Sequence, residues 1–595
     1  MSLQISKQPR YLITTDDERT WKFDRPVVFL GEWCRVFDRK HVWQDMDAVV
    51  AAPYGLGLAK KDSDHAEART LEENLFPVLC DALNQYHGVM HSELFWRIVL
   101  GHWLRRYVDV MLNRVKTLKY CLQTYQITGT TAYGIDGYSL ATPDSYSAIW
   151  AFNNSRWNNT LTVRILDLMG QARIPVEFIE GCASSGFRFE VLATTPTLKR
   201  KILRWGYQQV GKLASCLVRD NDAFIINSYL DKKEEVKLQL ALGQCPQLWV
   251  FPKLEISEKP DSLLRESLAS QVESNSNNSL GDILTAMVFE LLPVCYLEGF
   301  AHLNKLAKKQ NWPKNPKFIF TSNNFDTDEV FKRWTAKKVE SGITYIIGQH
   351  GNNYGTYRYM YPSIEESTAH KYLTWGWTDG LPQHTPAFVF KTTVRKAEQY
   401  KLQDGLLLIE LHLNHRSSTW DDTAEFENYF EEQQCFIGGL VTDLKKHLTI
   451  RLHPGYHYHK FCEETRWQAF DPSLRIDNGE VGIRDLVAQS RLVVHSYDST
   501  CILETLSQNI PTLAFWQNGF DHLRESAKPY YQLLVDAGIV HLNPESVAQK
   551  VNEVWDDVDG WWSKSEVKEA RSRFCERYAR VSQNRVRELK QILSR

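Results

Sequence analysis

Residues 491–516, RLVVHSYDSTCILETLSQNIPTLAFW, contain three successive segments that differ in the spacing of their apolar residues. Residues 491–495 form a short apolar run that is typical of a buried strand, and residues 500–508 have the spacing of an amphipathic helix. A second apolar run, 511–516, follows Asn509 and predicts another strand. Strand, helix and strand in this order predict a parallel sheet that is covered by helices.

The same alternation extends over the rest of the chain. Towards the C-terminus we predict strands at 406–411 and 448–452, helices at 423–446 and 482–489, and a helical tail from Pro544 to Arg595. In the first half, apolar runs predict strands within 25–37, 317–325, 343–355 and 371–377. The whole pattern predicts the α/β class.

Two features divide the chain into lobes. Helical spacing over about 66–125 predicts an insert of two or three helices. A Pro/Thr-rich connector, TDGLPQHTPAFVFKTT (378–393), separates the two series of strands. Since 595 residues are too many for a single core, we predict two Rossmann-like lobes, 1–385 and 386–595.

Composition narrows the function classes. The 70 basic and 72 acidic residues leave a net charge of −2, so no global field favours a nucleic acid. Eleven cysteines without a CxxC pair indicate a reducing compartment. The N-terminus lacks the apolar core of a signal peptide, and no run of 18 apolar residues occurs, so we expect a cytoplasmic protein.

Three loops follow strands of the second lobe. They are HLNHRSST (412–419), which contains His412 and Arg416, HPGYHYH (453–459), and SYDST (496–500). Ligands of parallel α/β sheets bind at the carboxyl ends of the strands, so we expect the loops to share one ligand.

The last two of these loops predict an anion site. Ser499 or Thr500 would cap the helix at 500–508, whose first N–H groups and dipole favour negative charge. Pro454 fixes the backbone after His453, and Ser496 adds a hydroxyl. Because no GxGxxG or GxxxxGK[ST] occurs, the expected ligand is a nucleotide phosphate held without a glycine-rich loop. Zinc at His453, His457 and His459 is the alternative, but no Cys or carboxylate follows at a typical interval.

These motifs carry a resemblance. RLHP (451–454) followed by VVHSYDST (493–500) resembles the His-Pro and Ser/Thr motifs of GT-B glycosyltransferases that use CMP-activated acidic sugars, such as sialyl- and Kdo-transferases. The resemblance implies that His453, Ser499 and Thr500, together with Ser496, hold the CMP phosphate. LITT, FLGEWCR, LNQYHGVMHSELFWRIVLGHWL, QHGNNYG and TWGW extend the likeness over nearly the whole chain, to bacterial O-antigen and surface-polysaccharide transferases.

The first lobe supplies candidate catalytic groups. Glycosyl transfer requires a base or a nucleophile on the acceptor side. We select Asp326, which follows a strand end, and His350, which small neighbours leave open to a ligand; Glu32 is a third candidate. A base would give inversion and a carboxylate nucleophile retention, and the sequence leaves both open.

Structural roles compete with these assignments. Asp326 or Asp328 could cap the helix that follows, and Glu32 could pair with Arg35. Trp96 and Trp103 lie seven residues apart, as core residues on one helix face do. Three nearby arginines could instead meet an anionic lipid-linked acceptor or the inner membrane surface: Arg97, Arg105 and Arg106.

The function predicted from these observations is a metal-independent glycosyltransferase. It would move Kdo or another nonulosonic-type acid from a CMP donor to a bacterial O-antigen or capsule, with no further cofactor. One alternative is an NDP-sugar or polyol-phosphate transferase on the same fold, because the QHG motif resembles one found in polyol-phosphate transferases. The other is a non-catalytic carbohydrate-binding or assembly subunit. A UDP-sugar epimerase fits less well, because the helical insert is large for one small substrate.

Overall fold

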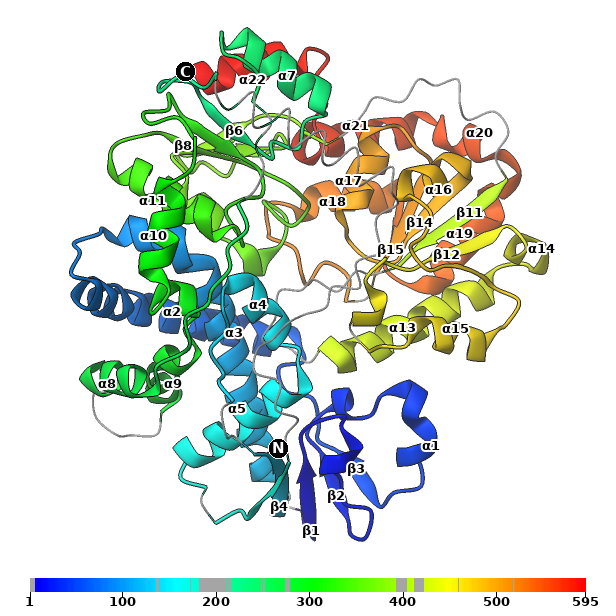
Figure 1. Ribbon diagram of the computed structural model, residues 1–595. Helices are drawn as coiled ribbons and strands as arrows, with labels where there is room; N and C mark the ends of the chain where they lie inside the picture. Colours follow the sequence, from blue (N-terminus) through cyan, green and yellow to red (C-terminus); the bar gives the residue numbers. More distant parts are fainter. Residues whose placement is uncertain are drawn as a thin grey trace.

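The protein is described by a computed structural model, in which three parallel sheets are each flanked by helices (Figure 1). The described residues are 6–134, 138–171, 173–180, 211, 215, 217–247, 249, 252–272, 279–391, 404–410, 422–458, 460–516 and 518–595.

The first sheet is formed by the N-terminal residues and has the order β3-β2-β1-β4-β5. Its strands are β1 (Ser6–Ile13), β2 (Val27–Phe29), β3 (Ala48–Val50), β4 (Tyr125–Tyr133) and β5 (Val176–Ile179). β2 is buried on both faces, which explains why its sequence is a continuous apolar run.

The second sheet has the order β10-β9-β8-β7-β6. Its strands are β6 (Phe224–Ile226), β7 (Ile319–Thr321), β8 (Tyr345–Gly348), β9 (Lys371–Thr374) and β10 (His384–Pro386). β7 and β8 are parallel neighbours, so the loops that contain Asp326 and His350 leave the same edge of this sheet.

The third sheet has six strands in the order β13-β12-β11-β14-β15-β16. They are β11 (Gly405–Ile409), β12 (Leu448–Arg451), β13 (Arg475–Asp477), β14 (Ser490–His495), β15 (Thr512–Phe515) and β16 (Val540–His541). β12 and β14 both pair with β11, which places the loops after them at one edge.

Helices fill the space around the sheets. In the first part of the chain they are α1 (Lys40–Trp43), α2 (Leu58–His87), α3 (Glu93–Thr124), α4 (Ser145–Ala151), α5 (Ser155–Leu168), α7 (Lys232–Ala241), α8 (Ser262–Val272), α9 (Leu280–Leu291), α10 (Phe300–Lys308), α11 (Glu329–Glu340) and α12 (Ile364–Thr368). The later helices are α13 (Asp422–Gly439), α14 (Thr442–Lys445), α15 (Glu463–Phe470), α16 (Ile483–Gln489), α17 (Thr500–Ser507), α18 (Lys528–Asp536), α19 (Pro544–Val554), α20 (Val558–Trp562), α21 (Ser565–Tyr578) and α22 (Arg585–Ser594).

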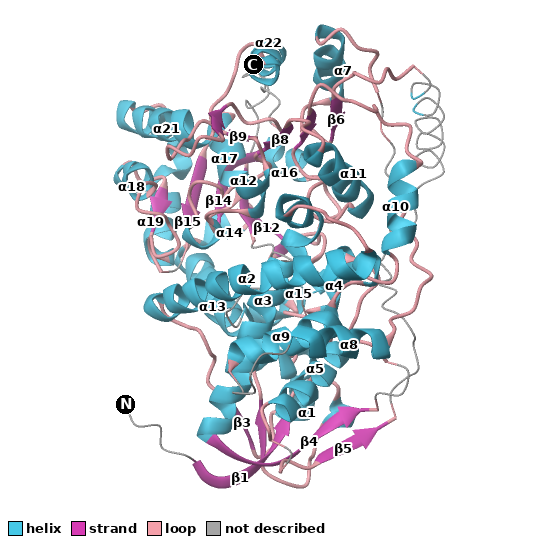
Figure 2. Ribbon diagram, turned by 90° about the vertical axis from the view of Figure 1, so that its left-hand side faces the viewer, coloured by secondary structure: helices cyan, strands magenta, loops and turns pink. Residues whose placement is uncertain are grey.

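The long helix α3 connects the first two sheets. It packs against β4 of the first sheet and against α11 and α12, which flank strands of the second. Figure 2 shows α2 and α3 between the first sheet, at the bottom, and the other two sheets above. Trp96 and Trp103 are fully buried on α3, so they are core residues.

The last helix of the chain returns to the second sheet. α22 packs beside α7, as Figure 1 shows. Leu589 and Leu593 of α22 join one core cluster with Phe320, Ile346 and Leu373 of β7, β8 and β9. The C-terminal tail therefore contributes to the core of a sheet whose strands lie much earlier in the sequence.

The α/β class with parallel sheets is confirmed, and the predicted strands of the third sheet agree with the structure to within two residues. Residues 1–385, which we expected to form one lobe, hold two sheets. Apolar runs identify strands but do not say which strands pair. Ala387, Phe388 and Phe390, beyond the expected boundary, are buried in the core of the second sheet.

Candidate active site

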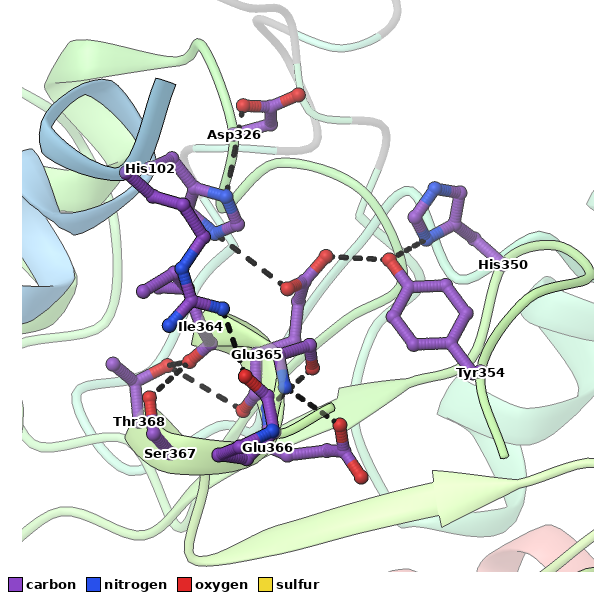
Figure 3. Close-up of polar contacts among 12 residues, drawn as sticks. His102, Asp326, His350, Tyr354, Ile364, Glu365, Glu366, Ser367 and Thr368 are labelled. Carbon is purple, nitrogen blue, oxygen red and sulfur yellow. Dashed lines mark hydrogen bonds and ion pairs between the residues drawn. The ribbon is translucent and has the colours of Figure 1, made fainter. Parts of the chain in front are cut away.

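Asp326 and His350 belong to one polar cluster at the carboxyl edge of the second sheet (Figure 3). His102 of α3 and Glu365 of α12 lie between them. The His102 ring has Nδ1 3.8 Å from Asp326 Oδ1 and Nε2 4.0 Å from Glu365 Oε2. Tyr354 completes the connection from Glu365 to His350.

Asp326 is held in place through its carboxylate and its backbone. Arg106 Nη2 donates to both carboxylate oxygens, at 2.6 and 2.8 Å. Lys332 Nζ donates to the Asp326 carbonyl at 3.0 Å. Lys332 is itself fully buried and paired with Glu329 at 3.0 Å. The loop after β7 is therefore anchored by two buried cations.

Asp328, and not Asp326, caps the following helix. Its carboxylate accepts a hydrogen bond from the Phe331 N–H at the start of α11. Burial raises the pKa of Asp328 to about 6. The N-cap role that competed for this pair thus falls on Asp328, and Asp326 is available for the cluster.

His350 lies among aromatic rings and polar atoms. Tyr354 Oη is 3.3 Å from His350 Nδ1 and donates to Glu365 Oε1 at 2.5 Å. The rings of Phe325 and Tyr229 have their centroids 5.6 and 6.0 Å from that of His350. His350 therefore combines a defined hydrogen-bond partner with an apolar surrounding.

Gln349 shapes the loop that carries His350. Its Oε1 accepts from the Trp375 N–H at 2.9 Å and from Trp377 Nε1–H at 2.8 Å. Its Nε2 donates to the Gly351 carbonyl at 2.8 Å. The QHGNNYG and TWGW motifs are thus one structural unit, and the buried Gln349 joins them.

The His350 loop contacts the third sheet directly. The Asn352 N–H donates to Thr500 Oγ1 at 2.9 Å, and Asn352 Nδ2 donates to Asp498 Oδ1 at 2.8 Å. Asp498 is held in turn by Tyr531 and His522, at 2.9 and 3.0 Å. The carboxyl edges of the second and third sheets therefore meet at the β8 and β14 loops.

The start of α17 lies at this contact. α17 has eight residues, and Ser499 occupies its N-cap position without making a side-chain cap bond. The Ser499 side chain is 4% exposed, and its Oγ has no hydrogen-bond partner among the described residues. A buried hydroxyl without a hydrogen bond is costly, so this oxygen is a candidate donor to a ligand.

Positive charge surrounds the same helix start. Burial raises the pKa of Glu504, whereas Lys391 and Arg484 act to lower it, so both cations lie close to α17. Arg451 and Lys391 act in the same way on the Cys501 thiol, whose pKa burial raises to about 12. This environment favours an anion at the N-terminus of α17.

His453 and Pro454 follow β12 at the same sheet edge. The Gly455 N–H donates to His453 Nδ1 at 3.0 Å. Since Nδ1 accepts this bond, the neutral ring carries its hydrogen on Nε2, which can donate to an anion. Pro454 packs on Gly479, where an added Cβ would come within 2.5 Å of the Pro454 Cα.

Ser496 and Glu32 are placed apart from these groups. The Ser496 side chain is 2% exposed; its Oγ donates to the Ile409 carbonyl at 2.9 Å and lies 2.6 Å from Tyr429 Oη. This hydroxyl supports the sheet from inside. Glu32 follows β2 of the first sheet and forms the ion pair with Arg35, at 2.6 Å, that was its structural alternative.

The arginines considered for a lipid or membrane contact are used inside the protein. Arg106 holds Asp326, and Arg105 donates to Glu72 at 3.0 Å and to the Pro362 carbonyl at 2.7 Å. Arg97 lies over the Phe76 ring with its guanidinium 4.0 Å from the centroid. These three arginines therefore have partners within the protein, and their contact with a lipid or a membrane stays a prediction.

Some predicted residues lie outside the described part of the chain, namely His412, Arg416 and the zinc candidate His459. Within the described ranges, no group of three His, Cys, Asp or Glu side chains could hold a metal ion. No helix among these residues is both long and apolar enough to span a bilayer.

The sequence did not single out three members of the cluster, namely His102, Tyr354 and Glu365. Tyr354 lies within the QHGNNYG motif, and Ser363 with Glu366 forms a capping box that could have located α12. His102 lies within the LNQYHGVMHSELFWRIVLGHWL motif, but no local pattern points to its partners, which are more than 200 residues away along the chain.

Comparison with known proteins gives distant structural likenesses and one family. No curated protein sequence matches the chain. Spinosyn rhamnosyltransferase SpnG, complexed with spinosyn aglycone, is 10% identical over 50% of this chain and 77% of its own, with a TM-score of 0.28. The S. aureus MnaA–UDP structure is 14% identical over 49% and 83%, with a TM-score of 0.29. WaaG, a glycosyltransferase involved in lipopolysaccharide biosynthesis, is 12% identical over 50% and 95%, with a TM-score of 0.25.

The family comparison extends over almost the whole sequence, including every loop described above. The model of the LIC12162 family transferases matches residues 10–593, and the chain therefore belongs to this family of transferase enzymes.

Proposed function

We propose that this transferase is a glycosyltransferase that moves a sugar from a nucleotide-activated donor to a hydroxyl group of a glycan. In this proposal the donor phosphate lies at the start of α17, and the acceptor hydroxyl lies beside the Asp326 and His350 cluster. The observation that carries the proposal is the buried Ser499 Oγ, which has no partner among the described residues and lies next to the contact between Asn352 and Thr500.

The phosphate position is supported by the donors that this edge of the third sheet offers. The first N–H groups of a helix have no partners within the helix. Ser499 adds a hydroxyl, and His453 adds an Nε2–H from the loop after β12, at the same sheet edge. Helix start, hydroxyl and imidazole are neutral donors of the kind that bind phosphate. Lys391 and Arg484 add positive charge, so in this proposal no divalent ion is needed.

The acceptor position is supported by the proximity of the two loops. His350 and Asn352 are two residues apart, and Asn352 bonds to the residue that begins α17. A sugar attached to a phosphate at α17 would therefore have its anomeric carbon near the His350 cluster. Proximity of this kind is what a group transfer requires, since reacting atoms must approach to about 3–3.5 Å.

For the donor we propose a CMP-activated acidic sugar, such as Kdo or another nonulosonic-type acid, and for the acceptor a bacterial surface polysaccharide. The donor assignment rests on the likeness of the RLHP and SYDST motifs to those of CMP-sugar transferases.

A nucleotide-binding experiment tests the proposal. We expect calorimetry to detect CMP binding in preference to UDP, GDP and CDP, and to find it unchanged by a chelator. Ser499→Ala and His453→Ala should each weaken CMP affinity about 10-fold, as the loss of one hydrogen bond to a charged group does.

The binding experiment includes a control variant and has results that would contradict the proposal. Ser563→Ala removes an exposed hydroxyl of the same lobe and should leave affinity unchanged. Preference for UDP, GDP or CDP would replace the CMP donor with another activated donor. Binding without turnover of any donor would indicate a non-catalytic subunit, and no nucleotide binding at all would refute the proposal.

A further inference from the structure

The hydrogen bonds around His350 determine which of its ring nitrogens carries the proton. Glu365 is buried, with 2% of the residue exposed, and its Oε1 accepts the Tyr354 O–H at 2.5 Å. A phenol has one hydrogen, and here it is directed at the Glu365 oxygen. Tyr354 therefore donates its only hydroxyl hydrogen to Glu365.

The contact between Tyr354 and His350 then has one direction. With its hydrogen directed at Glu365, Tyr354 Oη must accept, so the bond of 3.3 Å runs from His350 Nδ1–H to Tyr354 Oη. The neutral imidazole is thus the Nδ1–H form, with its lone pair on Nε2. Figure 3 shows the three side chains in this order, from Glu365 through Tyr354 to His350.

Asp326 is arranged for a different task. Arg106 Nη2 donates to both of its carboxylate oxygens, at 2.6 and 2.8 Å, and His102 Nδ1 lies 3.8 Å from one of them. A carboxylate that accepts from a guanidinium is a weakened nucleophile, because its charge is already compensated. The hydrogen bonds that run from His350 through Tyr354, by contrast, end on the Glu365 carboxylate.

We infer that Tyr354 and Glu365 are positioning residues that fix His350 as the general base, and that the transfer inverts the anomeric centre. This inference rests on the proposed function. The arrangement follows the logic of a base that a hydrogen-bond acceptor orients through its other nitrogen.

The step is a single displacement. The acceptor oxygen forms a bond to the anomeric carbon of the donor sugar, while the bond from that carbon to the donor phosphate oxygen breaks. The acceptor proton moves to His350 Nε2, and the electron pair of the broken bond leaves on the phosphate oxygen at the α17 start. Tyr354 and Glu365 stabilise the imidazolium that forms.

The experiment measures product configuration and the kinetics of matched tyrosine variants. We expect the wild-type product to have the inverted anomeric configuration by NMR. Tyr354→Phe should lower kcat roughly 10–100-fold with KM values within about twofold, since it removes orientation of the base and no substrate contact. The acid limb of the pH–rate profile of this variant should move to lower pH, because the imidazolium of His350 loses a hydrogen-bond acceptor.

Tyr359→Phe is the control. Tyr359 lies five residues along the same loop and donates to Asp62 at 3.0 Å, so this variant also loses a phenol–carboxylate bond. It should keep the wild-type rate and pH profile. If Tyr354→Phe fails to fold, Glu365→Gln should show the same loss of kcat, and imidazole added to His350→Ala should restore part of the rate.

The outcomes separate the inference from the proposed function. A retained configuration, or a Tyr354→Phe variant with the wild-type kcat and pH profile, overturns the inference and leaves glycosyl transfer intact. A wild-type protein that transfers no sugar from any nucleotide donor overturns the proposed function, and the inference with it.

Discussion

His350 and His453 carry their imidazole hydrogens on opposite nitrogens, and each assignment follows from one neighbour. A backbone N–H directed at Nδ1 leaves His453 with a donor at Nε2, whereas a phenol oxygen at Nδ1 leaves His350 with a lone pair there. A hydrogen-bond donor suits the binding of an anion, and a lone pair suits the acceptance of a proton. The same residue type therefore fits two tasks at two sheet edges.

A second pair of residues at the third sheet predicts a dependence of stability on pH. Burial raises the pKa of Glu463 to about 7, and raises that of Glu410 well above its usual range, with Glu463 as a further cause. Trp467 Nε1 donates to Glu410 Oε1 at 2.6 Å. Both carboxyl groups are thus held where the neutral form is favoured.

Glu463→Gln should therefore be more stable than the wild type at pH 8 but not at pH 5. Because the folded-state pKa is raised, the contribution of Glu463 to stability is complete below about pH 4.5 and is lost as the pH rises through about 7. A shift of this size corresponds to at most ~3 kcal/mol. Urea denaturation at both pH values measures it.

Glu480→Gln is the control, since Glu480 is an exposed glutamate of the same lobe. It should change the free energy of unfolding equally at pH 5 and pH 8. Parallel pH dependence of the wild type and Glu463→Gln would show that Glu463 is ionised in the folded protein at both values.

At the scale of elements, the loop after β8 connects the two sheet edges and leaves no room for a larger residue. A Cβ on Gly351 would lie 2.9 Å from Thr500 Oγ1, closer than real contacts allow. The next residue, Asn352, bonds to the same Oγ1. Glycine here permits the close approach of the β8 and β14 loops.

Gly351→Ala should separate these loops and lower the free energy of unfolding by about 1–3 kcal/mol, as overpacking does. The double variant with Thr500→Ala relieves the clash, so the two losses should not add, and the coupling should reach about 1 kcal/mol or more. Urea denaturation of the four proteins of this cycle measures the coupling. Additive losses would mean that the two loops do not press on each other.

The sequence predicted the positions of helices and strands well, but not which strands pair in one sheet. Hydrophobic periodicity and apolar runs predicted β12, β14 and α17 almost to the residue, because such patterns are local. They could not show that the range 1–385 holds two sheets, since strand pairing is a long-range property. Two of the cluster residues, Asp326 and His350, could be selected because both follow strand ends.

The remaining members of the cluster are set by tertiary packing. His102 reaches Asp326 only because α3 packs against α11 and α12 beside the second sheet, and no spacing in the sequence encodes that packing. Glu365 looks like any acid in the first turn of a helix until its contact with Tyr354 is known. Ser496 shows the opposite case, a motif residue whose hydroxyl is turned to the interior.

At the scale of the whole molecule, the C-terminal helix ties the end of the chain to the second sheet. Leu589 is fully buried in the cluster with Phe320 and Leu373. Arg585 Nη2 also donates to the Val389 carbonyl at 3.3 Å, near the end of the same cluster. α22 is therefore an integral part of this core.

Leu589→Ala should lower the free energy of unfolding by about 2–5 kcal/mol, the range for removing a fully buried leucine side chain. Leu542→Ala, at a leucine that is 41% exposed, should cost less than about 0.5 kcal/mol. Equal losses in the two variants, measured by urea denaturation, would show that α22 does not complete the core.

The return of α22 to the second sheet has a consequence for biosynthesis. The ribosome finishes the last strand of that sheet at Pro386, yet Leu589 and Leu593, which complete the core on one of its faces, are synthesised only after the whole third sheet. Until then the apolar residues that these leucines cover are open to chaperones and proteases.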